Sequence, residues 1–198
     1  MSQWKSWSDE ELARRAQEGD DAAFAELVDR YTPVIYRVAR GMTGSGQDAE
    51  DIVQETFLRA YTHLEGYAPS QSAFRTWLLT IARNLAINLI HALKRRAARF
   101  LDDVGSVLDT DRSSSEPSFL RETDTDAESF MIRQEQMQRL ERVLNKLPQR
   151  QRAVLVLKAY EGLGYAEIAK IMGTSESSVE SLIFRARKKL VELLGKES

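Results

Sequence analysis

The chain has 198 residues, of which 42% are hydrophobic and 29% charged, which is typical of a folded globular protein and excludes a disordered one. It has no cysteine and only two histidines, His63 and His91, so disulfide bonds and thiolate chemistry are excluded and a histidine metal site is not expected. The net charge of −2 is unevenly distributed, since residues 1–97 carry −1, residues 98–127 carry −5 and residues 128–198 carry +4.

The first half of the chain is predicted to be helical. Ser8 and Glu11 form a capping-box pattern that indicates a helix start. Apolar residues then recur at steps of three and four across residues 24–42, which predicts one face of a long helix. Pro33 lies within this pattern and predicts a kink or a local break, and the glycines from Gly41 onward end the helix.

Two more helices are expected before residue 97. One starts near Gln47 and places Ile52 and Phe57 on the same side. Glycine, proline and serine in residues 66–72 predict a loop, and a third helix is expected from about Ala73 to Arg96.

Residues 98–127 lose this periodicity. Aspartates, consecutive serines and a proline predict a flexible acidic linker, within which Phe100, Leu101, Val104 and Leu108 could form a short helical piece.

Helical periodicity returns at Glu128 and continues to Leu147. Pro148 suits the first turn of a helix predicted from Gln149 to Tyr160, and two short helices are expected after it. No strand is predicted. The expected fold is therefore all-α, with small helical domains at residues 1–97 and 128–198 joined by the acidic linker.

The segment from Tyr165 to about Leu182 has the spacing of a DNA-binding helix-turn-helix. Two helices that cross closely need a small residue at the contact, a turn residue that tolerates positive φ, and apolar residues that hold the second helix in place. These roles fall on Ala169, Gly173, Val179 and Leu182, with Val179 and Leu182 facing Ile168 and Met172 and with Ser175 as the N-cap. A helical hairpin in an ordinary bundle is the alternative.

Charges near this motif support DNA binding with one exception. Arg185, Arg187, Lys188 and Lys189 form a basic cluster that would attract phosphates, although such a cluster also suits a solvated helix end. Glu180 lies on the face expected to approach DNA, where it would either accept from a cytosine amino group or face solvent.

Several motifs together resemble the extracytoplasmic-function group of RNA polymerase sigma factors, over essentially the whole chain. They are Asp48 to Ala60, Phe74-Arg75-Thr76-Trp77-Leu78, Ile81-Ala82-Arg83-Asn84, Leu147-Pro148 with Gln151-Arg152, Tyr165-Ala166-Glu167-Ile168-Ala169 and Phe184-Arg185-Ala186-Arg187.

The resemblance implies binding to core RNA polymerase and to promoter DNA. Contact with the β′ clamp helices is implied for Asp48, Asp51, Gln54, Glu55 and Leu58, and the β flap is a further implied contact. An acidic face around a small apolar centre suits a basic helical hairpin.

The resemblance also implies that the segment after residue 66 reads and opens the minus-ten element, where unstacked bases need aromatic and polar partners. The residues implied are Tyr67, Phe74, Arg75, Trp77, Arg83, Asn84, Lys94, Arg95 and Arg96. For Phe74 and Trp77, core packing is an alternative of at least equal weight.

Minus-thirty-five contacts are implied for Ser177, Ser178, Ser181, Arg185 and Lys188. Glu180 and Leu182 depart from the basic residues common in the family, so the base preference is left open. The linker is implied to enter the polymerase channel, with a plain tether as the alternative.

The resemblance implies an anti-sigma partner, often membrane-bound. Neither a cofactor, a metal nor catalytic residues are expected, because no phosphate loop, ligand spacing or nucleophile–base set occurs. No apolar run of about 18 residues and no secretion signal at Met1–Asp9 are present, so a cytoplasmic protein is expected. A free-standing DNA-binding regulator and an enzyme with a DNA-binding tail are the two alternative functions.

Overall fold

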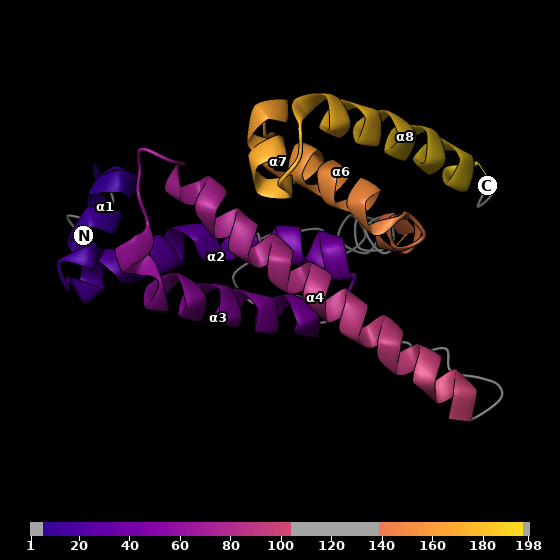
Figure 1. Cartoon of the computed structure of the whole chain (residues 1–198), viewed down its shortest axis with the longest axis horizontal. Coiled ribbons are helices and arrows are strands. Elements are labelled where there is room, and N and C mark those ends of the chain that lie inside the picture. Colours follow the sequence, from indigo (N-terminus) through magenta and orange to yellow (C-terminus); the bar gives the residue numbers. More distant parts are fainter. Residues whose placement is uncertain (1–5, 104–138, 196–198) are drawn as a thin grey trace, which may run out of the picture.

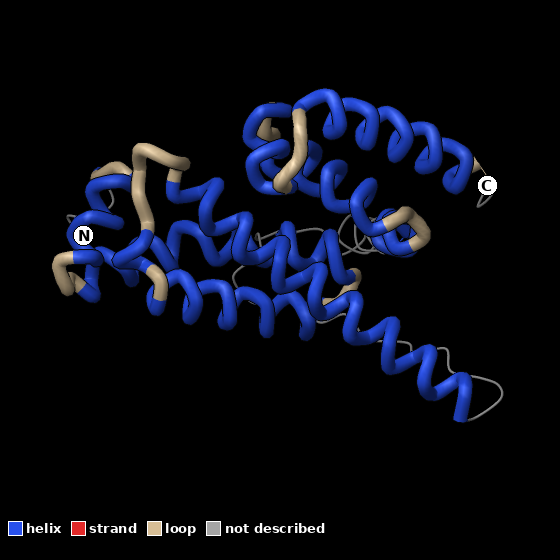
Figure 2. The backbone as a smooth tube through the Cα atoms, in the orientation of Figure 1, coloured by secondary structure: helices blue, strands red, loops and turns tan. Residues whose placement is uncertain are grey.

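The computed structural model describes residues 6–103 and 139–195, and every regular element in these ranges is a helix (Figures 1 and 2). This confirms the all-α prediction. In chain order the elements are α1 (Asp9–Gln17), α2 (Asp21–Thr43), α3 (Gly46–Thr62), the 3₁₀ turn η2 (Leu64–Gly66), α4 (Phe74–Asp103), a helical stretch at residues 139–145, α6 (Gln149–Glu161), α7 (Tyr165–Met172) and α8 (Glu176–Leu194). None of the described helices is long and apolar enough to cross a membrane.

Helices α1, α3 and α8 each begin where the side chain of a serine accepts from a free backbone N–H group. The Ser8 hydroxyl accepts from the Glu11 N–H at 3.2 Å and starts α1. Ser45 starts α3 through the Asp48 N–H at 3.2 Å. Ser175 starts α8 through the Ser178 N–H at 3.3 Å, which confirms the predicted cap. Each cap satisfies a donor that has no partner inside its helix.

Three predicted boundaries change. Helix α2 continues across Pro33, so a local break there is wrong; Tyr31 and Ile35 are buried on either side of the proline, and their packing holds the helix together. Helix α4 extends to Asp103, so residues 98–103 of the predicted linker are helical, and α8 is a long helix rather than a short one. Residues 104–127 of the linker, and the predicted channel entry, lie outside the described residues.

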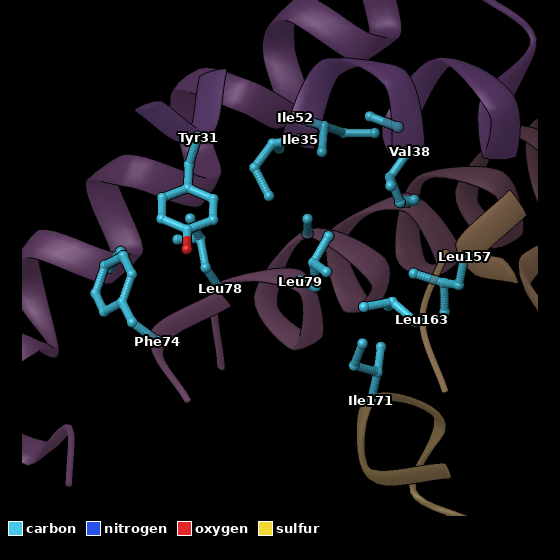
Figure 3. Packing of buried hydrophobic residues seen from close by; sticks show 14 of the residues in the cluster. Tyr31, Ile35, Val38, Ile52, Phe74, Leu78, Leu79, Leu157, Leu163 and Ile171 are labelled. Atoms are coloured by element: carbon cyan, nitrogen blue, oxygen red, sulfur yellow. The ribbon is translucent and has the colours of Figure 1, made fainter. Parts of the chain in front are cut away.

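The first core lies between α2, α3 and α4. Phe74, Leu78 and Leu79 of α4 are fully buried. They point toward side chains of α2 and α3 that include Tyr31, Ile35, Val38 and Ile52 (Figure 3). The last turns of α4 project beyond this layer (Figure 1), where residues 94–99 are exposed.

The second group of helices packs directly on the first. Helix α6 contacts α2, and α7 contacts α4. Leu157, Leu163 and Ile171 are buried in the same apolar cluster as Val38 and Leu79 (Figure 3). A separate small cluster of Leu144, Leu147, Leu155 and Ala186 holds α8 onto α6. The two helical groups therefore share one continuous core.

Candidate nucleic-acid and protein interfaces

Helices α7 and α8 form the predicted helix-turn-helix. Gly173 ends α7 at φ +59°, in the left-handed region that the turn requires. Ala169 is 6% exposed at the helix contact. Val179 and Leu182 are buried together with Ile168 and Met172, as predicted. The turn and the apolar contacts fix the orientation of α8 relative to α7.

The outward stripe of α8 is exposed. Its members follow one another at steps of three and one along the helix, which places them on one face; they are Ser177, Glu180, Ser181, Phe184, Arg185 and Lys188. The predicted contact Ser178 is half-buried beside this stripe. The Arg185 Nε donates to the Ser181 carbonyl at 3.2 Å and leaves the rest of the guanidinium in solvent.

Two residues of α8 now have defined positions. Leu182 is buried in the helix contact, so its departure from the basic residues of the family concerns packing and not base reading. Glu180 is exposed and has no ion pair among the described residues, and its contact with cytosine stays a prediction.

Phe184 is 70% exposed beside an open hollow of about 500 Å³. We did not predict a role for Phe184, although its spacing from Ser177 and Ser181 was a signal for the exposed face.

The acidic residues of α3 lie on the face opposite its buried side. Asp51 and Gln54 are exposed, Asp48 and Glu55 are half-buried, and Leu58 is 61% exposed. Glu55 forms an ion pair with Arg59 at 2.6 Å, so its charge is partly balanced within the helix.

The apolar part of this face continues to Tyr61, which we did not predict. Tyr61 is 52% exposed and donates from its hydroxyl to Asp21 at 2.9 Å. Its ring meets Phe24 edge-on with centroids 5.0 Å apart. Both rings line an open hollow of about 410 Å³ bordered by the carboxylates of Asp21 and Asp29. The surface thus combines apolar rings with acidic edges.

The predicted aromatic residues form a cluster at the start of α4. The Tyr67 and Phe74 ring centroids are 5.4 Å apart, and those of Tyr67 and Trp77 are 5.1 Å apart. Phe74 is fully buried and Tyr67 is 4% exposed, whereas Trp77 is partly exposed. Burial raises the pKa of Tyr67 to about 12. The burial favours the core-packing alternative for Phe74 and leaves Trp77 as the most accessible of the three rings.

The basic residues of α4 fall into two groups. Arg75 forms an ion pair with Glu161 at 2.7 Å, and the Arg83 Nη2 donates to the Met172 carbonyl at 2.6 Å. Burial, with a smaller effect of Arg150, lowers the pKa of Arg83. Asn84 is exposed beside Arg83.

Lys94, Arg95 and Arg96 are all exposed on the projecting end of α4. They begin about 15 Å further along the helix axis than Asn84, at the rise of an α-helix. The structure therefore does not bring the two basic groups together, and each would meet a different part of a nucleic acid.

The described residues contain no group of three histidine, aspartate or glutamate side chains that could hold a metal ion.

Comparison with protein families finds two matches. Residues 27–99 match the model of sigma-70 region 2, and residues 137–190 match that of sigma-70 region 4. The RNA polymerase sigma factor NccH of Alcaligenes xylosoxydans xylosoxydans is 36% identical over 186 residues, which is 94% of each chain. The ECF RNA polymerase sigma-E factor of Escherichia coli (strain K12) is 36% identical over 180 residues, or 91% of each chain.

Solved structures with similar folds come from the same group of proteins. CnrH in complex with the cytosolic domain of CnrY matches 96% of this chain and 99% of its own, with a TM-score of 0.68 and 28% identity. RpoE in complex with the anti-sigma factor NepR from Bartonella quintana matches 87% of this chain and 96% of its own, with a TM-score of 0.62 and 25% identity.

Proposed function

This chain belongs to the sigma-70 family of RNA polymerase sigma factors, in its extracytoplasmic-function group, and from that premise we propose how its surfaces carry out its function. It is a promoter-recognising factor that initiates transcription together with RNA polymerase. Such proteins are initiation factors and not enzymes in the usual sense, and the chemistry of RNA synthesis is assigned here to the polymerase.

The outer face of α3 is the proposed docking site for core polymerase. Asp48, Asp51, Gln54, Glu55 and Leu58 are the proposed contacts. The acidic side chains would steer a basic helical hairpin toward the exposed Leu58, whose burial on binding would add apolar contact. The β′ clamp helices are the proposed partner of this face, and the β flap is proposed for the second domain.

The two domains are proposed to read separate promoter elements. Residues 1–97 would bind the minus-ten element and help to open it, and residues 128–198 would bind the minus-thirty-five element. The observation that carries this proposal is the exposed stripe of α8, with Ser177, Ser181, Arg185 and Lys188 on one face of a helix whose other face is fixed by α7. Arg185 and Lys188 supply phosphate contacts, and the serines reach the bases or the backbone.

The minus-ten contacts are proposed to come from α4. Trp77 offers a partly exposed ring for stacking, Asn84 is exposed for a hydrogen bond to a base, and Lys94 to Arg96 lie ready for phosphates further along the strand. Tyr67 and Phe74 would act mainly by holding the start of α4 in place.

An anti-sigma factor is a proposed partner, because CnrH and RpoE were both solved in complex with such proteins or their cytosolic domains. A cytoplasmic location is proposed on the same grounds as the function, since core polymerase and promoter DNA are its partners.

Run-off transcription with purified core polymerase tests the function. Templates carry upstream regions of the source genome, and reactions contain core polymerase alone or core polymerase with this chain. We expect discrete transcripts from a subset of templates only when the chain is present. Absence of any chain-dependent transcript on all templates, from polymerase that responds to another sigma factor, would contradict the proposal.

A further inference from the structure

One carboxylate of the C-terminal domain lies between two arginines of the N-terminal domain. Glu161 is the last residue of α6, and its side chain is 3% exposed. Arg37 of α2 donates to its Oε1 from Nη2 at 3.0 Å and from Nε at 3.2 Å. Arg75 of α4 donates from Nη2 to its Oε2 at 2.7 Å and to its backbone carbonyl at 3.1 Å. Two positive charges thus converge on a single negative one.

The pair of arginines has the geometry of an anion site. Guanidinium groups bind carboxylates and phosphates with the same paired N–H donors. The Arg37 and Arg75 side chains are 41% and 34% exposed, so both can be reached from solvent, whereas the carboxylate that they hold is almost fully covered. With Glu161 removed, the two charges would face the same point with no acidic partner.

A second arginine of α4, Arg83, also donates to an acceptor in the C-terminal domain. Roughly two turns after Arg75, Arg83 donates to the carbonyl of Met172, the last residue of α7. Helix C-terminal carbonyls carry partial negative charge. Arg75 and Arg83, two of the α4 arginines that the family resemblance implies for the minus-ten element, therefore bind acceptors of the C-terminal domain, and α7 lies beside α4 (Figure 1).

We propose that Arg37 and Arg75 form a binding site for a DNA backbone phosphate, and that Glu161 fills this site in the compact form in place of the phosphate. The identity of the strand as promoter DNA rests on the proposed function, but the anion site itself does not. Arg37 is a new contact, because it lies on α2, outside the segment assigned to the minus-ten element. Binding of Glu161 and binding of the strand are then mutually exclusive states of the same two guanidinium groups.

The test uses the full chain and a fluorescein-labelled single-stranded DNA 12-mer of mixed sequence, without polymerase, followed by fluorescence anisotropy at low salt. Glu161→Gln keeps the side-chain shape and removes its charge. We expect it to bind the oligonucleotide about tenfold more tightly than the wild type, since charge-assisted contacts become available to the strand. The salt dependence should also steepen, with a slope change of roughly −0.7 for each additional phosphate contact.

Two substitutions in the site and two control substitutions identify it. In the Glu161→Gln background, Arg37→Gln or Arg75→Gln should remove most of the gain. Arg40→Gln should keep it, because Arg40 lies one turn along α2 from Arg37 and binds Glu141 at 2.8 Å instead. Glu50→Gln, at an exposed position of α3, changes the net charge equally and should leave the affinity near that of the wild type.

An affinity for the oligonucleotide that Glu161→Gln leaves unchanged would overturn the proposal. A gain in affinity that Arg37→Gln and Arg40→Gln remove equally would overturn it as well. Circular dichroism checks that each variant is folded. Should Glu161→Gln not fold, Arg37→Gln alone is compared with the wild type at high oligonucleotide concentration: weaker binding supports the site, and equal binding overturns it. A transcription assay that fails while these affinities change as expected would reject the sigma-factor function and leave the anion site standing.

Discussion

Replacing Gly41 with alanine tests how closely α2 and α6 pack. A Cβ at Gly41 would lie 2.8 Å from the Tyr160 Cε2 and 2.9 and 3.0 Å from the two methyl groups of Val156. Val156 is 1% exposed and β-branched, so its methyl groups have no free rotamer to move into. The added methyl group must therefore push α6 away from α2.

The steric clash affects the packing of α6 on α2, whereas the helix preference of alanine affects the stability of α2 itself. Overpacking by one methyl group costs about 1–3 kcal/mol, which favours separation of the two domains by roughly 5- to 150-fold. Alanine is also better than glycine inside a helix by about 1 kcal/mol. That gain applies whether or not α6 touches α2, so it stabilises α2 without opposing the separation.

Small-angle X-ray scattering measures the separation as an increased radius of gyration of the full chain. Thermal unfolding followed by circular dichroism should show helices at least as stable as those of the wild type. Gly66→Ala is the control, because a Cβ there meets no atom within 4 Å and should leave the scattering curve unchanged. A Gly41→Ala curve that superposes on that of the wild type would refute the close packing of α2 on α6.

Three further predictions concern charge and protonation. Reversing the charges of Asp51 and Glu55 to lysine should weaken binding to core polymerase by at least about tenfold, since like charges that face each other at a protein interface cost several kcal/mol. Glu65→Lys, at an exposed position outside α3, is the control in a fluorescence titration, and equal affinity of all three proteins would exclude this docking face. Arg185→Ala should weaken binding to a minus-thirty-five duplex at a cost of about 1–3 kcal/mol. Arg142→Ala, which changes another exposed arginine of the second domain, should leave this binding unchanged. Equal binding of the wild type to the true and to a scrambled upstream element would disprove the assignment. Burial and the hydrogen bond that Tyr31 donates to Asp9 raise the pKa of Tyr31 above its ordinary value of 10.0. The folded state therefore holds that proton more tightly than the unfolded state, and its contribution to stability is complete below pH 10 and is lost as the pH rises above it. Urea unfolding between pH 8 and 11 should show a shallower alkaline loss of stability for Tyr31→Phe, and identical slopes would contradict the role of this hydroxyl.

The individual helices could be predicted because their signals are local. The cap at Ser175, the left-handed turn at Gly173 and the apolar steps from Ile168 to Leu182 are each specified by residues within a few turns of one another. Hydrogen bonding and side-chain spacing within one helix pair determine them. The exposed faces of α3 and α8 follow directly, since burial of one side of a helix leaves the other side in solvent.

Some candidate contacts depended on packing between helices. The rings of Tyr67 and Phe74 suit base stacking by their chemistry, but their burial against each other and against Trp77 is decided by how α4 enters the core. Similarly, Pro33 suggested an interruption of α2, and the apolar contacts on both sides of it keep the helix continuous.

The sequence by itself determined the all-α fold, the helix-turn-helix and the family, because each depends on short-range patterns. The placement of the two domains against each other was decided only by the tertiary structure. Arg37 and Arg75 meet Glu161 across 124 and 86 positions of the chain. Nothing in the local pattern of an arginine or a glutamate indicates which distant partner it binds, because that choice depends on the shared apolar core that brings α2, α4 and α6 together.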